Sequence, residues 1–251
     1  MTSSSRLRFA SFLAPCNRPL YEFVARACGA HELIDGGHWR ELAEGEIDAA
    51  FVCSPPLIWL EGHLEAIGAP VLTDPRFNGQ PLYSSEVVVR RDSTYRSLAD
   101  LRGGRWAVNE PSSWSGYWVT LARVGDWSFF DEVVAAGFHQ RALRMVAAGE
   151  VDGAAIDCQV LAVEQRDHPE LRDALKIVES LGPAPIQPVV VRADLEPAVK
   201  ASLRKTLLSV RGRALEKFFV RRFAPPPDYA SVAAVVTSAA EREADAIRSY
   251  S

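Results

Sequence analysis

The sequence has few residues of the kinds that disulfide-bonded and metal-binding domains use. Its four cysteines form no CxxC pair, and its five histidines show no HExxH spacing. Free cysteine is among the most buried residue types, so we predict four reduced, mostly buried thiols. We also predict no metal site and no cofactor.

The sequence also lacks a basic excess and a long apolar run. It has 28 Lys and Arg against 32 Asp and Glu, a net charge of −4, which argues against a nucleic-acid partner. No run approaches the roughly 20 apolar residues of a membrane span, so no membrane insertion is expected. The segment RLRFASFLAPC has an apolar part of about seven residues, at the low end for an export signal, and Pro15 precedes Cys16 where cleavage sites have small residues. As it stands, the sequence predicts a cytoplasmic protein, or a periplasmic or cell-surface one if an export signal was removed.

Common catalytic motifs are missing as well. There is no GxSxG, no P-loop and no GxGxxG in the sequence. Cys53 and Cys158, with His139, could in principle supply a thiol nucleophile and a base, but no spacing places them within reach of each other. The question of an enzyme stays open at this point, with a binding function favoured.

What the sequence does contain is an alternation of short apolar runs and helical patterns, which is typical of βαβ units with largely parallel sheets. Two stretches share one pattern: EGEIDAAFVCSPPLIWL (44–60) and AGEVDGAAIDCQVLAVE (148–164). Each reads as a Gly-Glu turn, an Asp, a buried strand and a helix. We therefore predict two similar α/β lobes. Residues 1–88 and 186–251 would form lobe 1 and residues 89–185 lobe 2, with strands at 83–93 and 186–192 as the crossings. The C-terminal run YASVAAVVTSAA is predicted to pack on lobe 1.

Three ordered motifs carry a family resemblance over roughly 45–192. They are YSSEVVVRRDS (83–93), SLADLRGGRWAVNEPSSWSGYW (97–118) and AAGFHQRALRMVAAGEVDGAAID (135–157). In this order and spacing they resemble the phosphonate- and phosphite-type solute-binding proteins of ABC transporters. The resemblance implies a type II periplasmic-binding fold, with two mixed, mostly parallel sheets joined by two crossover strands.

The serine cluster in NEPSSWSGYW is the first candidate site. Hydroxyl groups and backbone N–H groups at a helix start can hold an anion without lysines, because the helix dipole favours negative charge there. Ser112, Ser113 and Ser115 would supply hydroxyls, and Gly116 would allow close backbone approach. The alternative is a simple N-cap, which needs only one serine. The resemblance favours ligand binding and adds Tyr117.

Trp114 departs from the family pattern, which has a small hydroxyl residue at that position. A tryptophan removes one donor and adds a large apolar face. Either the site takes a larger ligand with an aromatic or apolar part, or the Trp114 side chain points away and the anion site is intact.

Four further candidates follow from the resemblance. His139 starts a helix and would donate to a ligand oxygen, and Asp157 ends a buried strand and would orient the other end of the ligand. The alternatives are a structural histidine and an N-cap aspartate. Tyr83 and Glu86 lie on the predicted crossover strand, where Tyr83 would contact ligand and Glu86 would hydrogen-bond either the hinge or the ligand.

In lobe 1 the sequence gives positional candidates only. Ser11 and Phe12 end the first strand, and Cys53 and Ser54 end the third. The resemblance implies an aromatic residue near the ligand, for which Phe12, His38 and Trp39 are all open.

Together these observations predict a two-lobed binding protein for a small anionic ligand of the phosphonate or phosphate-ester kind. It would be the solute-binding component of an ABC transporter or a cytoplasmic homologue of one, with a permease or a regulatory protein as its partner. Two alternatives remain: a biosynthetic enzyme on the same fold, of the thiamine-pyrimidine or menaquinone-pathway type, and a ligand-binding sensor.

Overall fold

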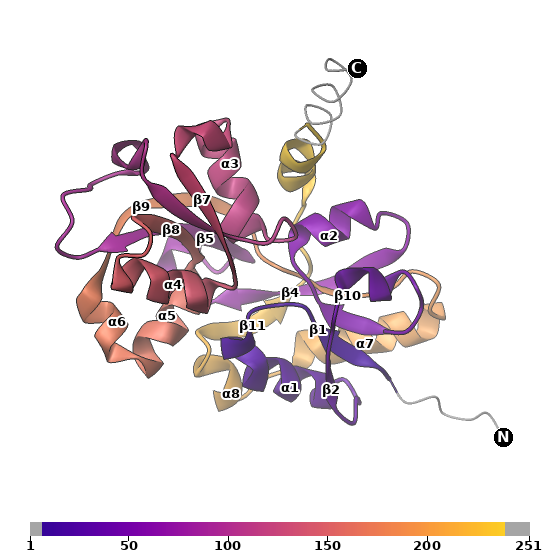
Figure 1. The fold of residues 1–251 in the computed structure, drawn as a ribbon. Helices are drawn as coiled ribbons and strands as arrows, with labels where there is room; N and C mark the ends of the chain where they lie inside the picture. The colour runs from indigo at the N-terminus through magenta and orange to yellow at the C-terminus, as the bar shows by residue number, and fades with distance from the viewer. Residues whose placement is uncertain (1–6, 239–251) are drawn as a thin grey trace, which may run out of the picture.

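Two β-sheets form the centres of two lobes in the computed structural model, which describes residues 7–238 (Figure 1). The first sheet has the order β11-β4-β10-β3-β1-β2. Strands β2, β1 and β3 run parallel, whereas β10 and β11 pair antiparallel with their neighbours. Its strands are β1 (Phe9–Ser11), β2 (Leu33–Asp35), β3 (Ala49–Phe51), β4 (Leu64–Leu72), β10 (Val189–Arg192) and β11 (Val220–Ala224). Its helices are α1 (Arg18–Ala27), α2 (Ser54–Trp59), α7 (Pro197–Ser209) and α8 (Arg213–Glu216).

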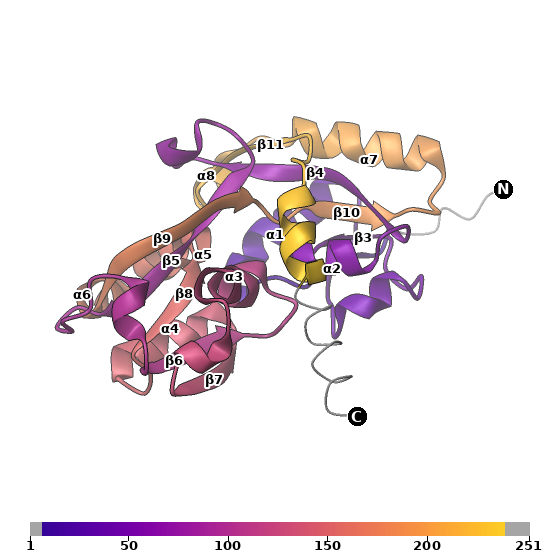
Figure 2. The same cartoon turned by 90° about the horizontal axis from the view of Figure 1, so that it is seen from above.

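The second sheet repeats this plan with the order β7-β6-β8-β5-β9. Strands β7, β6 and β8 run parallel, and β5 pairs antiparallel with both β8 and β9, which lie on either side of it (Figure 2). Its strands are β5 (Leu82–Arg90), β6 (Arg105–Asn109), β7 (Glu132–Gly137), β8 (Gly153–Asp157) and β9 (Leu175–Pro185). Its helices are α3 (Val119–Val124), α4 (His139–Ala148), α5 (Cys158–Asp167) and α6 (Pro169–Ala174). The predicted α/β class with two mixed sheets is confirmed.

The two stretches with a shared pattern occupy equivalent places. Residues 44–60 contain β3 and α2, residues 148–164 contain β8 and α5, and each strand is the third parallel strand of its sheet. In lobe 1, Arg8 donates its backbone N–H to Asp48 Oδ2 (2.9 Å) and its guanidinium to the Gly45 carbonyl (2.8 Å). The start of the first strand is thereby fixed to the start of the third.

Lobe 2 contains the same arrangement. Arg105, the first residue of β6, donates its backbone N–H to Asp152 Oδ2 (2.7 Å) and its guanidinium to the Gly149 carbonyl (2.9 Å). Gly149 has φ +75°, which favours glycine because an L side chain rarely adopts it. The shared sequence pattern therefore corresponds to a shared set of contacts: in each lobe an arginine at the start of one strand binds an aspartate and a glycine carbonyl that precede the neighbouring strand. We call this set of contacts the strand-start clamp.

The chain passes between the sheets twice. It leaves β4 and enters β5 through 73–81, and it leaves β9 and enters β10 through 186–188. The strands expected at 83–93 and 186–192 are not themselves the crossing segments. All of β5 pairs in the second sheet and all of β10 pairs in the first, so each strand begins after the chain has crossed. The predicted boundary after residue 88 falls within β5, whereas the one after residue 185 coincides with the end of β9.

Residues 230–238 are helical, and the last two residues of the run YASVAAVVTSAA (229–240) lie outside the described residues. Val232 and Val236 are buried in the core, and the Tyr229 hydroxyl donates to the Ile186 carbonyl (2.7 Å). The apolar side of this helix is therefore packed against the molecule at one of the two crossings.

Candidate functional site

A cavity of about 60 Å³ lies between the two lobes and is lined from both. Gln187, in the second crossing, completes its wall. The lining residues of lobe 1 are Phe12, Leu13, Ala14, Asn17, Tyr21 and Cys53. Those of lobe 2 are Asn109, Glu110, Ser112, Ser113, Ser115, Gly137, Phe138, His139, Asp157 and Val160.

The carboxyl ends of the parallel strands explain why these residues meet. Phe12 follows β1, Cys53 lies two residues after β3, and Asn109, Gly137 and Asp157 are the last residues of β6, β7 and β8. In open α/β sheets, ligands bind outside these strand ends. Helices begin just after the strands, so their positive N-terminal ends also face the cavity.

The serine cluster surrounds the start of a short π-helix, η5 (Trp114–Trp118). Ser113 is its N-cap, and its Oγ accepts a hydrogen bond from the Gly116 N–H (3.1 Å). Ser112 Oγ donates to Glu110 Oε1 (2.5 Å). Ser113 is thus the one serine of the three that caps the helix, as the N-cap alternative predicted. All three serines nevertheless line the cavity. Because Ser113 Oγ acts as an acceptor in its cap, its hydroxyl proton is the group that it could donate to a ligand.

His139 lies buried at the first position of α4, next to the serines. Its Nε2 is 3.0 Å from Ser115 Oγ, and no hydrogen-bond partner of Nδ1 is found among the described residues. Burial lowers the pKa of His139 to about 3, against a smaller raising effect of the Ala155 backbone. The ring is therefore neutral at neutral pH, so His139 offers a hydrogen bond but no positive charge.

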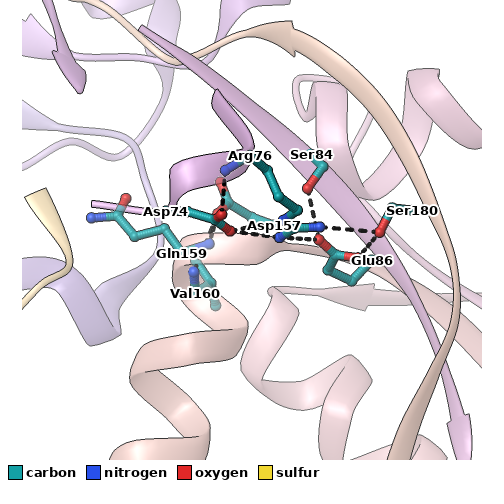
Figure 3. Close-up of polar contacts among 8 residues, drawn as sticks. All are labelled: Asp74, Arg76, Ser84, Glu86, Asp157, Gln159, Val160 and Ser180. Atoms are coloured by element: carbon teal, nitrogen blue, oxygen red, sulfur yellow. Dashed lines mark hydrogen bonds and ion pairs between the residues drawn. The ribbon is translucent and has the colours of Figure 1, made fainter. Parts of the chain in front are cut away.

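The two carboxylate oxygens of Asp157 accept hydrogen bonds from different parts of the chain. One carboxylate oxygen caps α5, accepting from the backbone N–H groups of Gln159 (2.7 Å) and Val160 (3.2 Å) (Figure 3). The other accepts from Gln187 Nε2 (2.6 Å), which ties the end of β8 to the second crossing. Burial raises the pKa of Asp157 above its usual range, although these three donors oppose that effect. The N-cap alternative is thus what the structure shows, on a residue that also lines the cavity.

Trp114 is buried, and it is not among the residues that line the cavity within the described chain. Its backbone N–H donates to Cys53 Sγ (3.2 Å), so a hydrogen bond joins the two lobes beside the cavity. Of the two alternatives that the sequence left open, the structure favours the one in which the side chain points away and the hydroxyl-lined wall is intact.

Four more predicted residues lie off the cavity wall. A Cβ on Gly116 would come within 2.5 Å of Asn109 Cγ, so this glycine allows close packing of η5 on β6. Tyr83 and Ser54 are buried, with hydroxyl groups that have no partner among the described residues. The Tyr117 hydroxyl accepts a hydrogen bond from the indole N–H of Trp127 (3.2 Å). Whether any of them touches a ligand stays a prediction.

Glu86 is buried on β5 and is not among the described residues that line the cavity. Figure 3 shows its polar contacts, which include Arg76 of the first crossing. Arg76, in the crossing segment 73–81, donates to Glu86 Oε1 (3.0 Å), as does the hydroxyl of Ser84 (2.7 Å). Ser180 on β9 donates to Glu86 Oε2, and Asp74 accepts from Arg76 Nε (2.9 Å). Of the two roles expected for Glu86, this geometry gives the contact with the hinge.

Several residues of the wall were missed in the sequence. Asn17 and Tyr21 come from the start of α1, Asn109 and Glu110 from the end of β6, and Gln187 from the second crossing. The position of Asn109 at the end of a buried strand was a usable signal, because the same reasoning selected Asp157. The others depend on how the lobes meet.

Comparison with protein families gives one match that covers most of the chain. Residues 36–229 match the model of the family described as "ABC transporter, phosphonate, periplasmic substrate-binding protein". A search of curated proteins found no match to this chain.

Solved structures with the same fold are numerous. PhnD1 from Prochlorococcus marinus, in complex with methylphosphonate, has a TM-score of 0.78 at 14% identity, covering 92% of this chain and 97% of that one. XAC2383 from Xanthomonas citri, bound to ATP, has a TM-score of 0.71 at 22% identity, covering 94% and 99%. A binding protein component of an ABC phosphonate transporter from Pseudomonas aeruginosa (PA3383) has a TM-score of 0.74 at 18% identity, covering 90% and 83%. At these identities the likeness establishes the fold, which is the two-lobed periplasmic-binding type.

Proposed function

Because this chain belongs to the family of ABC transporter phosphonate periplasmic substrate-binding proteins, we propose that its cavity binds the phosphoryl head of a phosphonate or phosphate monoester. It is a solute-binding protein of that family, and the proposal concerns which chemical group it holds and where. The observation that carries the proposal is a hydroxyl-lined cavity between the lobes, at the meeting point of strand ends and helix starts.

The chemistry of the wall fits an oxyanion held by neutral donors. Among the described lining residues there is no Lys and no Arg. The hydroxyl of Ser113 would donate directly, and those of Ser112 and Ser115 and the neutral ring of His139 would donate after exchanging their present hydrogen bonds, Ser112 to Glu110 and Ser115 with His139, for the ligand. The helix starts add partial positive charge, which is how helix N-termini hold phosphate groups in general.

The size of the cavity limits what it can enclose. A site needs about 10–15 Å³ of this kind of volume for each water molecule, so 60 Å³ has room for about four to six atoms of that size. A phosphoryl group has one phosphorus and three oxygens, and it fits this space. A larger substituent would have to extend out of the cavity between the lobes.

We expect the lobes to separate when the ligand enters. The cavity is walled from both sides, and the hydrogen bond from the Trp114 N–H to Cys53 Sγ crosses between the lobes. Hinge closure around a ligand is an established motion of two-lobed binding proteins, with a few linking residues absorbing the change. We assign this role to the crossings at 73–81 and 186–188.

The family also bears on partner and location. Members are described as periplasmic substrate-binding proteins of ABC transporters, so we assign this chain an ABC permease as its partner and the periplasm as its place of action. None of the helices within residues 7–238 is long and apolar enough to cross a membrane.

The thiols do not favour the enzyme alternative. A nucleophilic cysteine needs a lowered pKa, because the thiolate is the reactive form. Burial raises the pKa of Cys53 and that of Cys158 to about 12 each. Both are therefore thiols at neutral pH, so Cys53 is a poor nucleophile although it lies on the cavity wall.

The proposal can be tested by titration calorimetry and thermal unfolding with methylphosphonate, ethyl phosphate and inorganic phosphate. A ligand at 100 times its Kd stabilises the folded protein by about 2.7 kcal/mol, or roughly 5–11 °C in Tm for a chain of this size. Ser113→Ala should weaken binding about tenfold, since it removes a hydrogen bond to a charged group. Ser209→Ala on α7, a serine with only a local hydrogen bond to Thr206, is the matched control. If none of the three compounds binds, the proposal is wrong.

A further inference from the structure

A large groove adjoins the cavity and contains two of its lining residues. Its volume is about 760 Å³, and Glu110 and Ser112 belong to both linings. We call it the tryptophan groove. Its lining residues are His38, Trp39, Arg40, Ala43, Glu44, Trp59, Leu60, Glu110, Pro111 and Ser112. A substituent that leaves the cavity past Ser112 would therefore enter this groove.

Two indole rings, those of Trp39 and Trp59, belong to the lining of the groove, and the buried ring of Trp118 packs against Trp59. The centroids of Trp39 and Trp59 are 5.2 Å apart, and those of Trp59 and Trp118 are 6.3 Å apart. Trp59 is 37% exposed, which is unusual for so large an apolar side chain. The Arg40 guanidinium lies 4.6 Å from the centroid of the Trp39 ring, so one face of this cluster already holds a cation.

The charges of the combined lining have one predominant sign. Among the described residues that line cavity and groove, Arg40 is the only Lys or Arg, whereas Glu44, Glu110 and Asp157 carry carboxyl groups. A ligand with only negative charge would meet hydroxyl donors and helix starts in the cavity, but it would leave the carboxylates of the groove without a partner on the ligand. A ligand that also has a positive group would complement both parts of the lining.

From this geometry we propose that the tryptophan groove binds a bulky cationic substituent, such as a quaternary ammonium, of the ligand whose phosphoryl head occupies the cavity. This inference rests on the proposed function and adds to it the class of substituent that would lie outside the cavity: a bulky group with a permanent positive charge. The exposed indole of Trp59 would receive the cation on its face, because the ring quadrupole attracts positive charge. Glu110, which accepts a hydrogen bond from Ser112 at the border of the cavity, would stand between the two charged ends of the ligand.

The test compares two probes of the same shape. Phosphocholine and its carbon isostere 3,3-dimethylbutyl phosphate differ in the charge at one atom, and calorimetry gives the ratio of their Kd values on the full chain. We expect phosphocholine to bind about tenfold tighter, as cation–π contact and a nearby carboxylate allow. Trp59→Leu and Glu110→Gln should each bring the ratio close to one. Ile177→Ala on β9, which removes an exposed apolar side chain elsewhere, should leave the ratio unchanged.

The outcomes separate the two proposals. Equal Kd values for phosphocholine and the isostere would overturn this inference while leaving phosphoryl binding in place. Tighter binding of adenosine monophosphate than of phosphocholine would also overturn it, in favour of a planar substituent on the indoles. If no phosphate or phosphonate probe binds, the proposed function fails together with it. Since Glu110 is exposed, Glu110→Gln keeps the test valid even if Trp59→Leu does not fold.

Discussion

The buried, neutral state of His139 should make the stability of the protein depend on pH between 7 and 5. In the unfolded chain an imidazole has its ordinary pKa of about 6.5, whereas burial lowers the pKa of His139 to about 3. As the pH falls below 6.5, the unfolded state takes up a proton that the folded state does not, so the free energy of unfolding decreases. The linkage relation gives a loss of about 2 kcal/mol from this one residue between pH 7 and pH 5.

The measurement is urea unfolding of the wild type and of His139→Gln at both pH values. All other titrating groups are common to the two proteins, so the difference between their pH slopes isolates His139. We expect the wild type to lose about 2 kcal/mol more than the variant, or about 4–8 °C in Tm. His31→Gln, at an exposed position, is the control and should keep the wild-type slope. Equal slopes for the wild type and His139→Gln would show that the ring is not held neutral in the folded protein.

Three further predictions concern stability. Gly116→Ala should cost about 1–3 kcal/mol in urea unfolding, because the new Cβ would lie within 2.5 Å of Asn109 Cγ; a stability equal to wild type would contradict the close packing. Glu86→Gln should cost about 1–3 kcal/mol, since it removes one of the two carboxylates that pair with the Arg76 guanidinium, and small-angle scattering without ligand should then show a wider range of lobe separations. Asp152→Asn should cost about 1–2 kcal/mol by the same assay through loss of its charged hydrogen bonds at the start of β6, and an unchanged midpoint would show that the clamp contributes little.

Local patterns made the strands and their ends predictable. The apolar run VDGAAID ends at Asp157 and the run RWAVN at Asn109, and the strands β8 and β6 end at these same residues. A buried strand needs a continuous apolar run, and a polar residue at its end is therefore visible in the sequence. Because parallel strands share one carboxyl edge, the same reasoning places such residues together without any knowledge of the fold.

Features set by contacts between distant segments were not predictable. The strand β11 has only five residues, with Arg221 and Arg222 within it, so its sequence shows no clear alternation. The direction of the Trp114 side chain depends on core packing and on the hydrogen bond to Cys53, 61 positions away in the chain. Gln187 joins the site only because a crossing segment passes the end of β8. Periodicity describes neighbours along the chain, and these contacts are not between such neighbours.

The proposed ligand groups of lobe 2 also hold the helix starts that they occupy. Ser113 caps η5, and Asp157 caps α5 while it accepts a hydrogen bond from Gln187 in the crossing. A substitution at either residue therefore changes the free energy of unfolding as well as the cavity, and loss of binding alone would not identify a ligand contact. The two roles of Ser113 can be separated by substitution with glycine. Glycine is a tolerated N-cap that costs only a few tenths of a kcal/mol in stability, but it has no hydroxyl proton to donate to a ligand. Ser113→Gly should thus lose affinity for the phosphoryl probe with little loss of stability, which a purely structural serine would not do.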